Sequence, residues 1–158
     1  MKVLDLALFI ILVLVAAGCG TETGNPIDPD NLLDSPLPGI SSWENLLCSK
    51  IQSCFASIPE SCEQSTRNNS NMGKAFDVSK FGFFTLMDIH RALKSGLLSS
   101  NRQNQVSCAY AIQNLSCESH VIKNAYSEKN PNDFSNVPHL LKASQLCQQV
   151  YFESEEML

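Results

Sequence analysis

The sequence predicts an all-α protein, in which a small disulfide-stabilised domain of about five helices follows a signal peptide and a flexible tether. Apolar residues recur at helical spacing through most of the chain after residue 40. No run alternates apolar and polar residues for long enough to indicate a half-buried strand. The 158 residues include 7 cysteines, which favours a small domain held together by disulfides.

The N-terminus has the pattern of an export signal. Lys2 supplies positive charge, and an unbroken apolar run covers residues 6–17. That run is too short to cross a bilayer, which needs about 20 apolar residues in a helix. It matches the apolar region of a signal peptide, followed by small residues at the cleavage position. Residues 1–18 are therefore predicted to be a signal peptide.

The end of this signal resembles a lipobox, which would make Cys19 the lipidated first residue of the mature protein. The residues are Val15-Ala16-Ala17-Gly18-Cys19, with alanine at the position where leucine is commonest. Ordinary cleavage after Ala17 is the alternative, because small residues also suit that peptidase. Cysteine parity favours lipidation, since an odd thiol is awkward in an oxidising compartment and removing Cys19 leaves an even number.

Lipid on Cys19 would place the protein on a membrane. Several acyl chains anchor a protein stably, whereas one chain binds only marginally. Gly20 follows the cysteine, where aspartate would be the usual signal for retention in the inner membrane. We therefore expect a lipid-anchored protein of the outer membrane.

Charge and composition separate a tether and a tail from the domain. Residues 19–40 are rich in proline and glycine and carry acidic but no basic residues, so they are predicted to form an acidic tether. Residues 153–158 form an acidic tail, and residues 41–152 form the nearly neutral six-cysteine domain. Without a basic face, the domain is not expected to bind nucleic acid.

The domain is predicted to begin with a helix that extends to Pro59. Ser41 and Glu44 have capping-box spacing, and proline cannot continue a helix but is tolerated in the first turn of the next. A short second helix over 60–66 would carry Cys62, before an Asn-rich loop over 67–73. The face of the first helix would comprise Trp43, Leu46, Leu47, Ile51, Cys54, Phe55 and Ile58.

Three further helices are predicted. One covers 77–96 and ends at Gly96 in a left-handed cap. The next starts at Ser99, Ser100 or Asn101 and runs to residue 115. Residues 118–137 are expected to form a loop, and Pro138 to open a last helix that runs to residue 150.

Six cysteines allow fifteen disulfide pairings. On one continuous helix, Cys108 and Cys117 would lie about 13 Å apart, too far for a bridge. The expected pairs are Cys54–Cys62, Cys117–Cys147 and Cys48–Cys108.

Several short motifs together resemble those of a group of bacterial lipoproteins. The leader Gly20-Thr21-Glu22-Thr23-Gly24-Asn25-Pro26 is joined by Leu47-Cys48, Leu93-Lys94-Ser95-Gly96, Cys147-Gln148-Gln149-Val150 and the other cysteines. This pattern resembles six-cysteine helical lipoproteins of Bdellovibrio-like and myxobacterial predatory bacteria. The resemblance implies an envelope location and a disulfide-pinned helical domain, and it implies no activity.

The sequence indicates no catalytic centre, metal site or cofactor. The cysteines lack the Cys-x-x-Cys spacing of zinc knuckles and thiol exchangers. The histidines are His90, His120 and His139, without a zinc-protease or nucleophile-elbow motif. Asp88 and His90 are two residues apart and would point in different directions on a helix. Residues 28–34 contain three aspartates but have leucines where a calcium loop needs an oxygen ligand and glycine.

Two aromatic features bear on binding. In Phe81-Gly82-Phe83-Phe84, Phe81 and Phe84 would share a helix face, whereas Phe83 would point towards a second core contact or solvent. An exposed Phe83 would mark a partner surface. Trp43 is expected in the core.

The function predicted from these features is a non-catalytic envelope lipoprotein that binds another protein or stiffens an envelope assembly. The alternatives are a membrane-displayed small enzyme or enzyme inhibitor, or a carrier of an apolar ligand. An exposed aromatic patch without a polar cleft would favour the first class. Convergence of Asp88, His90 and a hydroxyl in one pocket would favour an enzyme, and a dry cavity between helices would favour a carrier.

Overall fold

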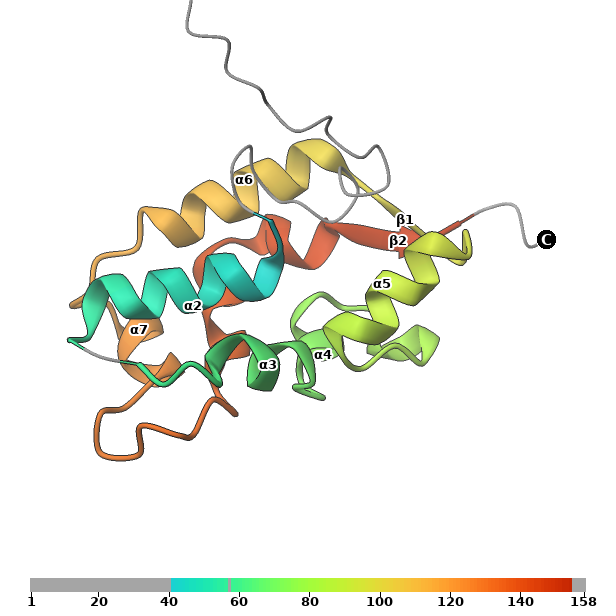
Figure 1. Ribbon diagram of the computed structural model, residues 1–158. Helices are drawn as coiled ribbons and strands as arrows, with labels where there is room; N and C mark the ends of the chain where they lie inside the picture. The colour runs from blue at the N-terminus through green and yellow to red at the C-terminus, as the bar shows by residue number, and fades with distance from the viewer. Residues whose placement is uncertain (1–40, 57, 155–158) are drawn as a thin grey trace, which may run out of the picture.

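The computed structural model describes residues 41–56 and 58–154, and these form a mainly helical domain with one small sheet (Figure 1). The predicted signal peptide, Cys19 and the tether lie outside the described residues. Six α-helices are described: α2 (Trp43–Cys54), α3 (Cys62–Arg67), α4 (Met72–Ala75), α5 (Leu86–Lys94), α6 (Arg102–Gln113) and α7 (His120–Ala125). Three 3₁₀ helices accompany them, η2 (Ser79–Phe81), η3 (Val137–Ala143) and η4 (Gln145–Gln149), with the strands β1 (Leu98–Ser100) and β2 (Tyr151–Glu153).

The C-terminal part of the chain joins the other elements into one core. Helix η3 contacts α4, α6 and α7, η4 contacts α6, and α2 packs on both α3 and α6. Figure 1 shows this C-terminal segment passing between α2 and α6 before it reaches the sheet. The largest fully buried side chains include Leu46, Leu47, Ile51, Met72, Phe76, Ile89, Ile112, Ile122, Leu140 and Leu141.

Helix α2 confirms the expected first helix but differs from it at both ends. The N-cap is Ser42, not Ser41, and its side chain accepts a hydrogen bond from the backbone N–H of Asn45. Glu44 therefore has no part in a capping box and pairs instead with Arg67. The helix ends at Cys54 because Phe55 adopts an extended conformation, four residues before Pro59. Trp43 is buried, as predicted.

The prediction of a single helix over 77–96 is wrong. Gly82 has φ +89°, a left-handed conformation that ends η2 and prevents a continuous helix. A new helix, α5, starts after Thr85, which forms a capping box with Asp88. The predicted left-handed residue after this helix is confirmed, because Gly96 has φ +74°.

Two of the expected loops also contain short helices. Residues 118–137 contain α7, which is capped by Ser119 and buries Ile122 and Ala125. The last two residues of the expected Asn-rich loop, Met72 and Gly73, belong to α4. The predicted start of α6 is confirmed, with Asn101 as its N-cap.

The prediction of one helix from Pro138 to residue 150 is also wrong. Ser144 is extended (φ −149°, ψ 141°), so it divides this segment into η3 and η4. The chain then enters β2, which pairs antiparallel with β1, and Leu98 lies opposite Glu153. The domain therefore runs one residue into the segment expected to be an acidic tail.

All six cysteines of the described domain form disulfides, but the expected pairs are wrong. The pairs are Cys48–Cys62, Cys54–Cys117 and Cys108–Cys147, with Cα–Cα distances of 6.0, 5.2 and 4.9 Å. Cys48 and Cys54 are six residues apart on α2 and point in different directions. Cys48 therefore meets the start of α3, and Cys54 meets the loop after α6.

Candidate functional site

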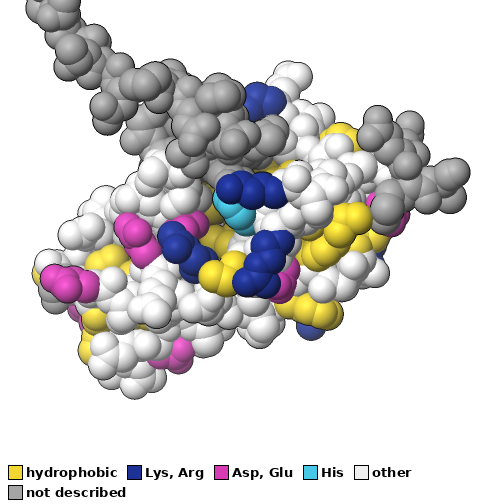
Figure 2. Space-filling view, turned by 45° about the vertical axis from the view of Figure 1, so that its right-hand side comes forward, with side chains coloured by type: hydrophobic (Ala, Val, Ile, Leu, Met, Phe, Trp, Pro, Cys, Tyr) yellow, Lys and Arg dark blue, Asp and Glu magenta, His cyan; other side chains and the backbone are white. Residues whose placement is uncertain are grey.

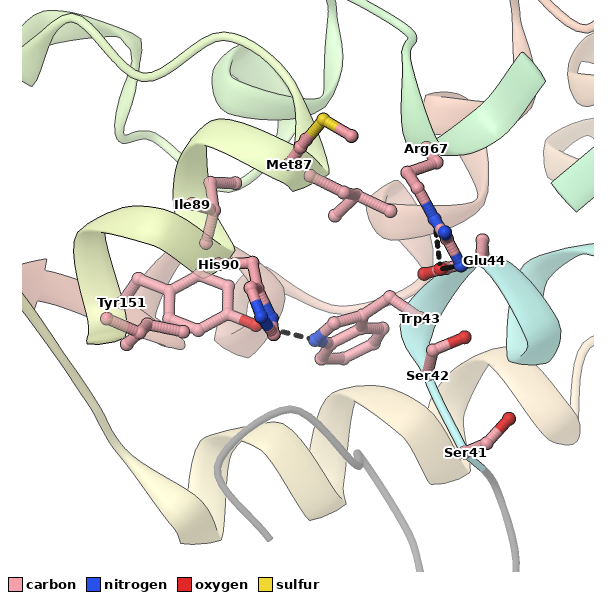
Figure 3. Close-up of a pocket in the computed structure, with 11 residues that line it drawn as sticks. Ser41, Ser42, Trp43, Glu44, Arg67, Met87, Ile89, His90 and Tyr151 are labelled. Atoms are coloured by element: carbon pink, nitrogen blue, oxygen red, sulfur yellow. Dashed lines mark hydrogen bonds and ion pairs between the residues drawn. The ribbon is translucent and has the colours of Figure 1, made fainter. Parts of the chain in front are cut away.

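A cleft of about 290 Å³ lies between the N-terminus of α2, the end of α3, α5 and β2. It brings together residues from four parts of the sequence. Figure 3 shows these side chains converging on one space. The lining residues are Ser41, Ser42, Trp43, Glu44, Arg67, Leu86, Met87, Ile89, His90, Leu93 and Tyr151.

The back of the cleft is a fixed aromatic cluster. The indole Nε1–H of Trp43 donates a hydrogen bond of 2.6 Å to the hydroxyl of Tyr151. The ring of Phe76 packs edge-on against both, with centroid distances of 5.0 and 5.1 Å. All three side chains are buried. Their polar atoms are paired and their rings are in contact, so this wall is rigid and mostly apolar.

An ion pair forms another wall. The Arg67 guanidinium Nε–H donates to Oε1 of Glu44 at 2.7 Å. Glu44 is only 6% exposed, whereas half of the Arg67 side chain is open to solvent. Glu44 is thus neutralised where it is buried, and the outer part of Arg67 remains accessible to a partner.

Helix α5 supplies the open side of the cleft. His90 is half-buried, and Figure 3 shows its ring beside the hydroxyl of Tyr151 and the indole of Trp43. Met87 lies one turn earlier on the same face and is 38% exposed. Figure 2 shows lysine and arginine side chains around a histidine on one face of the molecule, with hydrophobic side chains among them.

Asp88 does not line this cleft. Its carboxylate accepts hydrogen bonds from the backbone N–H groups of Thr85 and Phe84, at 3.0 and 3.3 Å. The Thr85 amide is the main cause that lowers the pKa of Asp88 below its ordinary value. The residue therefore serves the start of α5, and the convergence of Asp88, His90 and a hydroxyl that would indicate an enzyme is not present in the cleft.

The Phe81–Phe84 segment is arranged differently from the expectation. Because Gly82 breaks the helix, Phe81 and Phe84 do not share a helix face. Phe81 and Phe83 are half-buried against the core, and Phe84 is the exposed ring, at 50%. Phe84 and Met87 lie on either side of the capped start of α5 in the sequence, and both are exposed.

Within residues 41–56 and 58–154, no group of histidine, cysteine, aspartate or glutamate side chains is arranged to hold a metal ion. No helix in the same part of the chain is long and apolar enough to span a membrane. Comparison with protein families, curated proteins and solved structures finds no match to this chain.

Sequence reasoning found some cleft residues but not the cleft. It singled out Trp43 as core and His90 as an isolated histidine, and it gave no role to Arg67 or Tyr151. Trp43 and Tyr151 are 108 positions apart, so no local pattern joins them. The only available signal was an unusual set of residue types, a lone tryptophan with arginine and tyrosine in a small domain.

Proposed function

We propose that this chain is an exported lipoprotein whose helical domain binds another envelope protein through the Trp43–Tyr151 cleft. In this proposal residues 1–18 are removed, lipid on Cys19 anchors the protein in the outer membrane, and residues 19–40 hold the domain away from the bilayer. The resemblance to six-cysteine lipoproteins of predatory bacteria supports the same location.

The observation that carries the binding role is the composition of the cleft. Trp, Tyr, Met and Arg are the residue types enriched at the centres of protein interfaces, and Trp43, Tyr151, Met87 and Arg67 all line this one cleft. The Trp43–Tyr151 hydrogen bond and the Glu44–Arg67 ion pair hold three of them before any partner arrives. Such preorganisation reduces the entropy lost on binding.

The disulfides support export. Three pairs use every cysteine of the described domain, and disulfides persist mainly in oxidising compartments such as the periplasm. This pairing leaves Cys19 as the single cysteine without a partner in the domain, which is the parity expected for a lipidated residue.

A small enzyme displayed on the membrane is the second candidate, because His90 lies beside the hydroxyl of Tyr151 (Figure 3). We favour binding over catalysis because that hydroxyl already accepts a hydrogen bond from Trp43 and is buried in an aromatic cluster. A carrier of apolar ligands is less well supported, since the cleft includes a charged pair.

Lipidation can be tested with a fatty-acid analogue in growing cells. Wild-type protein should be labelled and found with the outer membrane, whereas Cys19→Ala should carry no label, because the thioether has no sulfur on which to form. Gel fluorescence and membrane fractionation measure both properties. Equal labelling of the two proteins would contradict lipidation at Cys19, and an unlabelled wild type would indicate ordinary cleavage after Ala17.

Binding through the cleft can be tested with a photoreactive amino acid at Met87 in the full chain in cells. A discrete cross-linked adduct should form, and it should be lost in His90→Ala but kept in Lys94→Ala, which changes the same helix one turn further on. Tyr110 is 54% exposed on α6 and provides the control position for the photoreactive group.

Comparison of the adducts formed at positions 87 and 110 separates specific binding from non-specific cross-linking. If position 110 gave the same adduct, or if His90→Ala left the Met87 adduct unchanged, the cleft would not be the binding site. Circular dichroism melting of each variant shows whether a lost adduct reflects unfolding instead of lost contact.

A further inference from the structure

A second pocket, of about 360 Å³, lies on the part of the domain formed by α4, η3, η4 and the loop before η3. Its basic groups are Lys74 from α4 and His139 and Lys142 from η3. No aspartate or glutamate is among the described residues that line it. This is unusual in a chain with a formal net charge of −5.

Among the described residues, neither Lys74 nor Lys142 forms an ion pair with an acidic side chain. Within residues 41–56 and 58–154, the cations that form ion pairs are Arg67, Lys80, Arg91 and Lys123. The acidic residue nearest in sequence to this loop, Asp133, accepts a hydrogen bond from the backbone N–H of Ser135. Two ammonium groups therefore border one pocket, and no carboxylate of the part of the chain that the structure describes pairs with them.

Neutral polar groups and apolar walls complete the pocket. Asn71, Asn136 and Gln148 have side-chain amides that donate hydrogen bonds, and Ser135 has a hydroxyl. Leu141 is almost completely buried and, with Ala75 and Pro138, supplies the apolar lining. Apolar surroundings lower the local dielectric and strengthen the attraction between an ammonium and an anion.

The charge of these features fits a phosphate ester better than a singly charged carboxylate. Lysine ammonium groups are compact charges that bind phosphate without a fixed planar geometry. A phosphate monoester carries about −1.5 to −2 charges near neutral pH, which matches two lysines. The geometry points to a phosphate-monoester site between α4, η3 and η4, filled by a small phosphorylated molecule or by a lipid headgroup of the same chemistry.

The site is separate from the Trp43–Tyr151 cleft and does not depend on the proposed function. The two pockets share no lining residue. Loss of one binding activity would leave the other intact, so each proposal can fail alone.

Lysine footprinting tests the site in the full chain isolated in detergent. An amine-reactive reagent is applied with increasing glycerol 3-phosphate, and the labelling rate of each lysine is measured by mass spectrometry. Lys74 and Lys142 should become protected in parallel, whereas Lys129, an exposed loop residue, should not change. Glycerol at the same concentrations controls for the uncharged part of the probe.

Variants connect protection to the proposed contacts. Lys142→Gln should raise the concentration needed to protect Lys74 by about tenfold or more, the usual effect of removing a hydrogen bond to a charged group. Lys74→Gln should have the same effect on Lys142, and Lys129→Gln should have none. Vesicles of phosphatidic acid, compared with phosphatidylcholine, report whether a lipid headgroup also protects the two lysines.

Protection by glycerol 3-phosphate alone would indicate a soluble ligand, and protection by phosphatidic acid would indicate a headgroup, so both outcomes support the site. Failure of both probes to protect Lys74 and Lys142 would overturn it. Equal protection of Lys129, or unchanged protection in the Lys142→Gln and Lys74→Gln variants, would show non-specific attraction and would overturn it as well.

Discussion

Replacing Gly73 with alanine is expected to lower the free energy of unfolding by about 2–5 kcal/mol, which combines overpacking with the loss of a backbone hydrogen bond. A Cβ at this position would lie 1.9 Å from the carbonyl oxygen of Phe83 and 2.8 Å from the Cα of Phe84. Both are backbone atoms, so no side-chain rotation can relieve the clash. One of the two segments would have to move.

One hydrogen bond joins these two segments directly, and a second holds Gly73 to the start of η2. The N–H of Gly73 donates to the carbonyl of Phe84 at 2.7 Å, and the carbonyl of Gly73 accepts from the N–H of Val78 at 2.8 Å. Separating α4 from the Phe83–Phe84 backbone would break the first bond and leave a buried group unpaired. The same backbone leads into α5, so the variant should also displace His90 and weaken cross-linking at Met87.

Urea denaturation measures the loss, with Gly82→Ala and Gly96→Ala as controls. These glycines have φ +89° and +74°, but a Cβ on either would meet nothing within 4 Å. Each control should therefore be destabilised only by the left-handed conformation, about 1–2 kcal/mol. If Gly73→Ala were no less stable than these two, the close approach of α4 to the Phe83–Phe84 backbone would not be rigid.

The helical class followed from the sequence because its signals are local. Apolar spacing predicted the face of α2, and short polar caps and glycines predicted the start of α6 and the left-handed residue Gly96 after α5. The same local reasoning missed Gly82, since an isolated glycine is tolerated within a helical pattern. In the structure Gly82 is left-handed, and the backbone that follows it lies against Gly73 of α4, a contact between segments that a local pattern does not contain.

The candidate site could not be predicted because it depends on contacts between distant segments. Its central hydrogen bond joins Trp43 to Tyr151, and its ion pair joins Glu44 to Arg67. The prediction of the disulfide partners was wrong for the same reason. The six cysteines were correctly expected to pair, but the choice of partners depended on where α2 ends and on the division of the last helix at Ser144.

Removing the buried Cys108–Cys147 bridge should also have a large effect, a loss of about 4 kcal/mol in the free energy of unfolding according to the chain-entropy relation. The bridge joins cysteines 39 positions apart, both 0% exposed, and attaches η4 to α6. Strand β2 follows η4 directly and carries Tyr151, so Cys108→Ala with Cys147→Ala should loosen the back of the cleft as well as the core.

Comparison with the Cys54–Cys117 bridge separates two contributions to the free energy of unfolding, the chain entropy lost on cross-linking and the burial of the bridge. It spans 63 positions, so chain entropy alone predicts a loss at least as large when it is removed. Cys117 is exposed and Cys54 only half-buried, so their removal leaves no closed cavity, whereas removal of the buried pair does.

We therefore expect the double alanine variant at 108 and 147 to be the less stable of the two in urea denaturation. Under limiting reductant, alkylation and mass spectrometry should find Cys54 and Cys117 free first, because thiol exchange requires access to the sulfur atoms. Simultaneous opening of all three bridges would mean that reduction proceeds through global unfolding. In that case burial would not protect one pair over another. If the double alanine variant at 54 and 117 were the less stable of the two, chain entropy alone would rank them.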